Sequence, residues 1–361
     1  MPESAKKIAI LTSGGDCAGL NAVIRAVVMR ADTLGWEVYG IEDGTHGLIQ
    51  RPVAARKLEL RDVDTYMLRQ GGTILGTTNK GNPFSYPMPD GTTKDLSEDI
   101  IEGLHQIGCD ALIGIGGDGS LAILHKLATQ GNFPLIGVPK TIDNDLGMTE
   151  TSIGFDTAVS VATEALDRLQ PTAASHDRIM ILEVMGRDAG HIALAAGIAG
   201  GADVILIPEI TYSLDRVVAH IKGIQKRGRN FALVVVSEAV KTAMGNNLKV
   251  SFEDGQTRFG GIGHYIGAEI ARLSGAETRV TVLGHVQRGG QPSAQDRLLA
   301  SAFGIHAVEL IEKGTFDRMV AWSNRQVIDV PITQAIEHYK QIEPTDPLVI
   351  TARGLGICLG D

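Results

Sequence analysis

The chain has 361 residues, of which 43% are hydrophobic and 21% charged, and its formal net charge is −9. This ordinary globular composition excludes a disordered chain, and the length suits two domains rather than one core. The negative charge argues against a general nucleic-acid-binding protein, so an anionic substrate would need a local cluster of basic side chains.

The cysteines and the apolar segments indicate in which cellular compartment the protein is expected. The three cysteines, Cys17, Cys109 and Cys358, are odd in number and far apart, which is typical of a reduced chain. Residues 1–7 lack the apolar stretch of a signal peptide, and the longest uncharged apolar region, 192–202, is too short to span a bilayer. We therefore expect a soluble cytoplasmic protein without membrane or nucleic-acid partners.

Short apolar runs alternate with segments of helical spacing along the whole chain. This alternation, with 44 glycines and few aromatic residues, predicts an α/β protein of two doubly wound halves that meet near Gly154. Ser97 is the expected N-cap of the second predicted helix. The predicted strands cover residues 7–12, 36–41, 111–115, 135–138, 178–183, 203–207, 231–236 and 280–283, and the predicted helices cover 20–34, 97–107, 121–128, 157–169, 217–224 and 295–312.

The first predicted strand ends in a glycine turn, Ser13-Gly14-Gly15-Asp16. A turn of this kind at a helix N-terminus can hold a phosphate with backbone N–H groups and the helix dipole. Its spacing is neither that of the dinucleotide fingerprint nor that of the P-loop. By itself it is equally compatible with a tight structural turn.

A second glycine turn, Gly116-Gly117-Asp118-Gly119-Ser120, follows the predicted strand 111–115. Its glycines would let backbone N–H groups approach phosphate oxygens. A carboxylate inside a phosphate cradle makes chemical sense chiefly with Mg²⁺ between the two, so Asp118 is the candidate metal ligand. The alternative is that Asp118 or Ser120 only caps the following helix.

The next predicted strand, 135–138, ends in Pro139-Lys140-Thr141-Ile142-Asp143-Asn144-Asp145. One carboxylate can accept a proton from an attacking hydroxyl while the other orients it. Both could instead be solvated turn residues. Because the carboxyl ends of parallel strands share one edge of a sheet, we expect these loops to converge there as a ligand site.

Basic side chains at predicted strand ends in the second half are candidates for binding a phosphomonoester. Glu238, which follows the strand 231–236, could accept hydrogen bonds from sugar hydroxyls or pair with a surface lysine. Scattered surface side chains are the alternative for each basic residue. The basic candidates are Arg178, Arg187, Arg279, His285 and Arg288.

Taken together, these motifs resemble the 6-phosphofructokinase family of the short bacterial type over nearly the whole chain. The stretches TIDND, MGR and GHVQRGG are highly specific, whereas GGDG also occurs in NAD kinases and lipid kinases. The stretches that carry the resemblance are LTSGGD (11–16), GGDGS (116–120), PKTIDND (139–145), EVMGR (183–187) and RVTVLGHVQRGG (279–290).

The resemblance implies a phosphofructokinase-like fold of two doubly wound, three-layer α/β domains. Residues 1–154 plus about 287–335 would bind the phosphoryl donor, and residues 155–286 plus about 336–361 would bind fructose 6-phosphate. The implied reaction is ATP-dependent phosphorylation of the 1-hydroxyl of fructose 6-phosphate, with Mg²⁺ as cofactor. Members of the family are obligate oligomers, usually tetramers, in which some arginines act in the site of a neighbouring subunit.

The resemblance also implies roles for individual residues. Asp143 would be the general base, with Thr141 beside the reacting phosphoryl group and Asp145 supporting, and Arg187 would lie near the transferring group. Asp118 would serve Mg²⁺, while Gly15 and the residues Gly117, Asp118, Gly119 and Ser120 would hold the ATP phosphates. The implied substrate-binding residues are Thr141, Ile142, Asp143, Arg178, Met185, Gly186, Arg187, Glu238, Arg279, His285, Val286, Gln287 and Arg288.

The chain departs from the family pattern at the donor site. Gly119 is typical of ATP-dependent members, and Lys140 is typical of pyrophosphate-dependent ones. We favour ATP, because a carboxylate at position 119 would crowd and repel the α-phosphate of a nucleotide. The alternatives are a pyrophosphate-dependent phosphotransferase and a silent sugar-phosphate-binding subunit, which would be expected to lack the catalytic acids present here.

Two further departures concern a bridging cation and regulation. Asn79 and Lys80 stand where the family usually has an arginine that contacts both substrates, and Lys80 would supply only a point charge. In the effector pocket the chain keeps Arg25 and Arg61, but two positions that are basic or histidine in allosteric members are Met29 and Phe231. These changes weaken the expectation of regulation by nucleotides or phosphoenolpyruvate.

Overall fold

The structure, a computed structural model, describes residues 6–79, 81–251 and 257–361. The chain folds into two compact units, each of which collects segments from distant parts of the sequence. Unit 1 comprises Met1–Thr141, Leu146–Asp156 and Arg288–Tyr339, and unit 2 comprises Ile142–Asp145, Thr157–Gln287 and Lys340–Asp361.

Unit 1 is built on a seven-stranded sheet in the order β15-β14-β7-β6-β1-β2-β3. The five inner strands run parallel, and the edge strands β3 and β15 are antiparallel to their neighbours. The central strands β1, β6 and β7 are buried on both faces, as expected for parallel strands covered by helices. The strands are β1 (Lys7–Thr12), β2 (Glu37–Ile41), β3 (Ala55–Leu58), β6 (Ala111–Gly116), β7 (Leu135–Pro139), β14 (Arg318–Ser323) and β15 (Gln326–Pro331).

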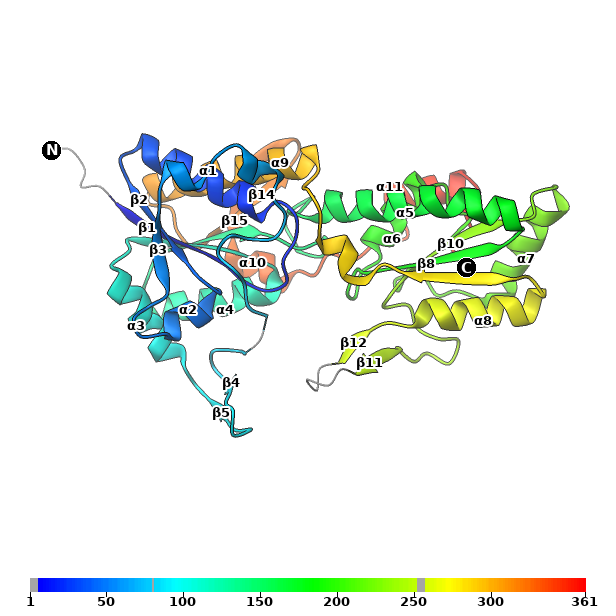
Figure 1. Ribbon diagram of the computed structural model, residues 1–361, viewed down its shortest axis with the longest axis horizontal. Helices are drawn as coiled ribbons and strands as arrows, with labels where there is room; N and C mark the ends of the chain where they lie inside the picture. The colour runs from blue at the N-terminus through cyan, green and yellow to red at the C-terminus, as the bar shows by residue number, and fades with distance from the viewer. Residues whose placement is uncertain (1–5, 80, 252–256) are drawn as a thin grey trace. The chain divides into compact units, whose positions relative to one another are not determined.

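Helices cover both faces of this sheet and give unit 1 three layers (Figure 1). Helices α1 and α9 pack against each other on one face. Apolar side chains of α2, α3, α4 and α10 join the core on the other face. The helices are α1 (Leu20–Thr33), α2 (Thr45–Ile49), α3 (Ser97–Ile107), α4 (Asp118–Gly131), α9 (Ala294–Glu312) and α10 (Ile332–Glu337), and β4 (Tyr86–Pro87) and β5 (Thr93–Lys94) form a small separate ribbon.

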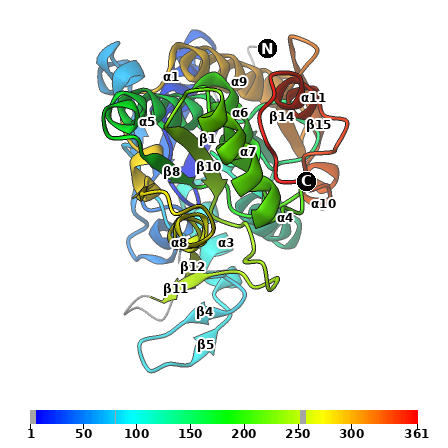
Figure 2. The ribbon, with the colours of Figure 1, turned by 90° about the vertical axis from the view of Figure 1, so that its right-hand side faces the viewer.

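Unit 2 contains a parallel four-stranded sheet in the order β13-β8-β10-β9. Side chains of α7 and α8 bury one face, while α5 and α6 cover the other (Figure 2). The strands are β8 (Ile179–Val184), β9 (Val204–Leu206), β10 (Ala232–Ser237) and β13 (Thr278–Val282), with a ribbon of β11 (Lys249–Ser251) and β12 (Thr257–Phe259). The helices are α5 (Phe155–His176), whose first two residues belong to unit 1, α6 (His191–Ala199), α7 (Leu214–Lys226), α8 (Ile262–Ser274) and α11 (Pro347–Gly354).

The doubly wound α/β prediction is confirmed, with three local corrections. The predicted N-cap Ser97 is wrong: Leu96 occupies that position, and the Asp95 carboxylate accepts from the Ser97 N–H at 2.8 Å. The strand predicted at 280–283 begins two residues earlier, at Thr278. It is also not the last strand, because β14 and β15 follow it.

Candidate functional site

Three glycine- and acid-bearing loops meet at one edge of the unit 1 sheet. Strand β6 lies between β1 and β7, and all three are parallel, so the segments that follow them leave from the same edge. Hydrogen bonds tie these segments together: the Ser13 N–H donates to the Ile115 carbonyl at 2.9 Å, and the Lys140 N–H donates to the Gly116 carbonyl at 3.0 Å. The segments after β1, β6 and β7 therefore share one edge as expected, as far as Thr141, while Ile142–Asp145 belong to unit 2.

Close packing against the side chain of Ser120 requires two glycines of these turns, Gly14 and Gly116. Gly14 has φ +83°, and a Cβ added there would lie 3.0 Å from Ser120 Oγ. A Cβ on Gly116 would lie 2.5 Å from the Ser120 Cβ, which no real side chain tolerates. At Gly119, by contrast, an added Cβ meets no heavy atom within 4 Å. The turn is therefore packed against its neighbour on one side and open at Gly119.

Asp118 is the first residue of α4, and Gly117 is the N-cap. Neither Asp118 nor Ser120 is the N-cap residue, so the alternative in which one of them serves only as the cap is wrong. The carboxylate lies at the positive end of the helix, beside backbone N–H groups that suit phosphate oxygens. One carboxylate next to a phosphate cradle is the protein ligand set that Mg²⁺ commonly uses, because the ion keeps waters and takes its other ligands from phosphate. These residues therefore fit Mg²⁺. Among the described residues, no group of three or more histidine, cysteine or acidic side chains could hold a metal without such help.

Two cations contact the glycine turn after β1. Lys140 is 4% exposed, and its Nζ donates to the Gly15 carbonyl. Arg288 Nη1 donates to the Asp16 carbonyl at 3.1 Å and lies 2.9 Å from where a Gly15 Cβ would be. This puts positive charge beside the proposed phosphate loop. It also places Arg288 in unit 1, apart from the other predicted basic residues, which belong to unit 2.

The segment after Gly76 also borders the glycine turn. The Gly14 N–H donates to the Thr78 carbonyl at 2.9 Å, and the Thr77 hydroxyl donates to the Gly14 carbonyl at 2.7 Å. Asn79, the next residue, is exposed. Lys80, the predicted substitute for a bridging arginine, lies outside the described residues.

In unit 2, the acidic segment Ile142–Asp145 is buried. Asp143 is 7% exposed and Asp145 is 2% exposed, so the alternative of a solvated turn is wrong. Between them, Asn144 has φ +54°, a left-handed conformation that Asn tolerates better than most residues and that lets two acidic residues flank a sharp bend. Thr141, which precedes this segment, belongs to unit 1, where its carbonyl accepts from the Ser152 hydroxyl at 2.7 Å.

The strand ends of the unit 2 sheet supply a second group of predicted residues. Strands β13, β8 and β10 are neighbours, so Gln287, the turn 185–187 and Glu238 come together. The Met185 N–H donates to Gln287 Oε1 at 2.7 Å. The N–H groups of Gly186 and Arg187 both donate to Glu238 Oε1, at 3.2 and 3.1 Å. Glu238 is therefore bound to the turn itself, and the alternative of a partner for a surface lysine is wrong.

The environment of Glu238 changes its protonation. Burial raises the pKa of its carboxyl to about 7, and the negative charge of Asp143 adds to this increase, while the N–H donors of Arg187 and Gly186 oppose it. Asp143 and Glu238 thus face the same region of unit 2. A carboxyl group whose pKa is raised by burial and by a neighbouring charge is typical of functional sites, although structural networks also produce such shifts.

Arg187 joins the turn to the acidic segment. Its Nη1 lies 3.7 Å from Asp145 Oδ2, and its backbone adopts φ +52°, which is uncommon for a non-glycine residue. The side chain is half exposed while Asp145 is buried. The guanidinium can therefore neutralise the acidic segment on one side and remain open to a ligand on the other.

Arg178 and Arg279 are not brought to this group. Arg178 directly precedes β8 and Arg279 is the second residue of β13, so both lie toward the amino ends of their strands, opposite Met185 and Gln287. Glu277 pairs with both, and its Oε1 is 3.0 Å from Arg178 Nη2. His285 and Val286 are exposed on the segment after β13.

One buried acid of this region received no role from the sequence. Glu183 is 2% exposed, and its carboxylate accepts from the N–H groups of Gly261 at 3.1 Å and Gly263 at 2.8 Å, which fixes the start of α8 next to β8. The available signal was an acidic residue inside an otherwise apolar strand. A buried charge of this kind needs partners.

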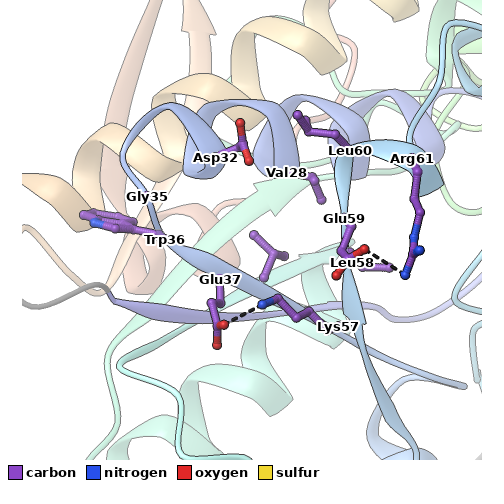
Figure 3. A pocket seen from close by; sticks show the side chains of 11 residues that line it. Val28, Asp32, Gly35, Trp36, Glu37, Lys57, Leu58, Glu59, Leu60 and Arg61 are labelled. Carbon is purple, nitrogen blue, oxygen red and sulfur yellow. Dashed lines mark hydrogen bonds and ion pairs between the residues drawn. The ribbon is translucent and has the colours of Figure 1, made fainter.

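A cavity of about 500 Å³ lies on unit 1 between α1 and the segment after β3 (Figure 3). Its two basic side chains, Lys57 and Arg61, each pair with a carboxylate, Glu37 and Glu59 respectively. Of the predicted effector residues it contains Arg61 alone. The weakened expectation of regulation by nucleotides or phosphoenolpyruvate stays a prediction.

Comparisons with known proteins identify the family of the chain. The profile of one family, described as "Phosphofructokinase", matches residues 7–311. The "ATP-dependent 6-phosphofructokinase 1" of a Nostoc species is 64% identical over 99% of both chains, and the protein of the same name from a Synechocystis species is 63% identical over the same shares. The T-state crystal structure of Pichia pastoris phosphofructokinase superposes with a TM-score of 0.81 at 30% identity, over 93% of this chain and 36% of that one.

A pyrophosphate-dependent phosphofructokinase from Marinobacter aquaeolei has a TM-score of 0.78 at 22% identity, over 99% of this chain and 92% of its own. At this identity the likeness concerns the fold alone. In the part of the chain that the structure describes, no helix is both long and apolar enough to cross a membrane.

Proposed function

This chain belongs to the phosphofructokinase family, and on that premise we propose that it is an ATP-dependent 6-phosphofructokinase. The reaction transfers the γ-phosphoryl group of ATP to the 1-hydroxyl of fructose 6-phosphate, giving fructose 1,6-bisphosphate and ADP. The observation that carries the proposal is the 64% identity, over 99% of both chains, to a relative named for this activity. Glycolytic sugar-phosphate phosphorylation is thus the reaction class.

The phosphoryl donor is assigned to the loops of unit 1. The turn 117–120 offers backbone N–H groups at the N-terminus of α4, where phosphate oxygens bind favourably, and Gly15 offers its N–H in the turn after β1. The cation Lys140 beside the first turn adds attraction for the triphosphate. Asn79 and Lys80 are proposed to complete the donor site.

Asp118 is proposed as the protein ligand of Mg²⁺, which would neutralise charge on the phosphate oxygens when bound. The remaining ligands would be waters and phosphate oxygens. The carboxylate contributes a fixed negative charge at the helix end, where it would otherwise compete with the phosphates. This competition is the physical reason for expecting a cation between them.

The acceptor is assigned to the acidic segment and the turn 185–187 of unit 2. Asp143 would take the proton of the 1-hydroxyl as the attack begins, and Asp145 would hold Arg187 in place. The guanidinium and Thr141 would stabilise the charge that develops on the transferring group. Buried carboxylates suit this role because few solvent molecules compete for the proton.

The sugar phosphate is proposed to occupy the strand ends of unit 2. Glu238 would exchange part of its hydrogen bonding for sugar hydroxyls, and the turn 185–187 that it fixes would line the ring. Arginine and histidine side chains would bind the 6-phosphate. The residues proposed for the sugar phosphate are Ile142, Met185, Gly186, Arg187, Glu238, His285, Val286 and Gln287, with Arg178, Arg279 and Arg288 for its phosphate.

The chain is proposed to act as a homo-oligomer with shared sites, the tetramer being the form expected. Arg178 and Arg279 lie toward the amino ends of β8 and β13, so in their own unit they are remote from the turn 185–187. A second copy of the chain is the natural source of these arginines for a site that needs them. Their pairing with Glu277 keeps both guanidiniums on one surface.

Pyrophosphate is the second candidate donor, and Lys140 is the observation that favours it. The Nζ of Lys140 donates a hydrogen bond to the Gly15 carbonyl, and the space beside Gly119 stays open. A catalytically inactive regulatory subunit that binds sugar phosphate is the third hypothesis. The chain keeps Asp118, Asp143, Asp145 and Arg187, which argues against it.

The deciding experiment compares donors in the purified chain. With fructose 6-phosphate and Mg²⁺, formation of fructose 1,6-bisphosphate is measured with ATP and with pyrophosphate at matched concentrations. We expect the higher kcat/KM with ATP. Faster turnover with pyrophosphate would assign the second candidate, and no turnover with either donor would reject both enzymes in favour of the regulatory subunit.

A further inference from the structure

A short segment near the C-terminus passes between two functional loops of unit 2. The Lys340 N–H donates to the Asp145 carbonyl at 2.9 Å, and the Lys340 carbonyl lies 3.0 Å from His191 Nε2. One residue of the segment therefore contacts the acidic segment with its N–H and an imidazole with its carbonyl. Neither contact uses a side chain of the segment.

His191 is the first residue of α6 and directly follows the turn 185–190 that carries Arg187. A carbonyl oxygen only accepts, so the proton of the imidazole must be on Nε2. Burial lowers the pKa of His191, which favours the neutral ring, and Lys340 lowers it further while the Lys340 carbonyl, Glu209 and Asp346 raise it. The neutral Nε2–H form can maintain the hydrogen bond.

Glu209 makes a second connection between the same two segments. Its Oε1 accepts from the Gly190 N–H at 3.0 Å and from the Ile342 N–H at 3.4 Å. A Cβ added to Gly190 would lie 2.4 Å from the Ile207 Cβ, so the backbone there is packed without spare room. Adjacent residues, Gly190 and His191, are thus both linked to the segment 340–342.

We propose that His191 is a positioning residue for phosphoryl transfer, an inference that rests on the proposed function. It holds the main chain of Lys340, which holds the Asp145 carbonyl, so the acidic segment and the Arg187 turn keep a fixed separation. The gap that this separation controls is the 3.7 Å between Arg187 Nη1 and Asp145 Oδ2. Misplacement of reacting groups by about 1 Å can cost about 100-fold in rate.

The test compares His191→Phe with His191→Gln. Phenylalanine keeps the volume of the ring but has no donor, whereas glutamine has an N–H near the position of Nε2. We expect His191→Phe to lower kcat about 10- to 100-fold with little change in the KM for ATP, and His191→Gln to restore most of the loss. His220→Phe is the matched control: His220 is a partly buried histidine of α7 in the same unit, with a pKa that burial also lowers, and kcat should not change.

Amide hydrogen exchange gives a readout that is independent of activity. The peptide containing Lys340 should exchange faster in His191→Phe than in the wild type or His191→Gln, while peptides of β8 and β10 stay protected. Equal exchange and equal kcat in all three proteins would overturn the proposal, as would equal losses in both variants. If the wild type itself has no activity, the proposed function fails. The hydrogen-exchange measurement then still decides whether His191 holds the main chain of Lys340.

Discussion

At the scale of single residues, Asp143 is the side chain on which the proposed chemistry depends most. It is buried in unit 2, in the same segment as Asp145, which pairs with Arg187. Asp143→Asn keeps the shape of the side chain but cannot take a proton. We expect kcat to fall by roughly 10²–10⁴ while the KM values for both substrates change little, as steady-state assays with ATP would measure.

The control for this variant is Asp32→Asn, because Asp32 is an exposed carboxylate at the end of α1, far along the chain from the acidic segment. Circular dichroism should show the same helix content in both proteins. A kcat for Asp143→Asn within a factor of two of the wild type would remove Asp143 from the mechanism.

Glu238 should make the stability of the folded protein depend on pH. Its pKa in the folded state, about 7, is above the value near 4.5 expected in the unfolded chain. Between these values the folded state binds more protons, so the contribution of Glu238 to stability is complete below pH 4.5 and is lost as the pH rises through 7. Glu238→Gln cannot titrate and should gain thermal stability relative to the wild type as the pH rises from 5 to 8.

Thermal midpoints of the two proteins, measured at half-unit intervals of pH, test this expectation. Glu102→Gln, a change of the same type at an exposed position of α3, should show no such difference. Parallel curves for Glu238→Gln and the wild type would show that the carboxyl titrates normally. The amide oxygen can still accept from Gly186 and Arg187, so the turn should keep its conformation.

At the scale of elements, we propose that the turn after β6 decides whether ATP or pyrophosphate is the phosphoryl donor. A Cβ added to Gly119 meets no heavy atom within 4 Å, so the protein does not block an aspartate at its Cβ. Gly119→Asp should lower kcat/KM for ATP about 10- to 100-fold through repulsion of the nucleotide phosphates, with a smaller effect on pyrophosphate. Parallel assays with ATP and pyrophosphate measure the ratio of the two kcat/KM values in the variant and in the wild type.

Gly119→Asn separates charge from crowding, since asparagine has nearly the same shape as aspartate. If repulsion is the cause, the asparagine variant should keep most of its activity with ATP. Equal losses in both variants would instead point to crowding. Unchanged kcat/KM in both would mean that position 119 does not face the donor.

Many strands could be predicted because a buried strand is a short run of apolar residues in the sequence. Strands β1, β6 and β7 are largely apolar and buried, and their boundaries were predicted to within one residue. Strand β6 ends at Gly116 and β7 at Pro139, while β1 ends at Thr12 just before the turn with Gly14 and Gly15. Strands β14 and β15 were missed because the turn between them, Asn324-Arg325, has φ +49° and +63° without a glycine. A hairpin turn with arginine in this conformation has no local sequence signal.

The candidate site was predictable where it follows from strand direction. Loops after adjacent parallel strands must share an edge, and the unit 1 loops do so. The same rule would have separated Arg178 and Arg279, which stand before or early in their strands, from Arg187, which follows one. The contact of Glu238 with Gly186 and Arg187 was not predictable, because it depends on the path of a short loop.

At the scale of the whole molecule, these arginines lead to a prediction about assembly. If they act in the site of a neighbouring copy, a chain with Asp143→Asn and a chain with Arg279→Ala carry defects in different halves of a shared site. Each homo-oligomer should be nearly inactive with subsaturating fructose 6-phosphate. A hybrid should regain activity, because some of its sites combine an intact Asp143 with an intact Arg279.

The hybrid is made by coexpressing the two chains with different affinity tags and isolating oligomers that carry both. The expected activity per site approaches that of the wild type in a substantial fraction of the sites, and the KM for fructose 6-phosphate in those sites is normal. A hybrid no more active than the mean of its parents would place Arg279 in its own chain's site or outside the mechanism. Arg279→Lys pairs with Glu277 but lacks the guanidinium fork, so a raised KM in that variant would tie the effect to phosphate binding rather than to the ion pair.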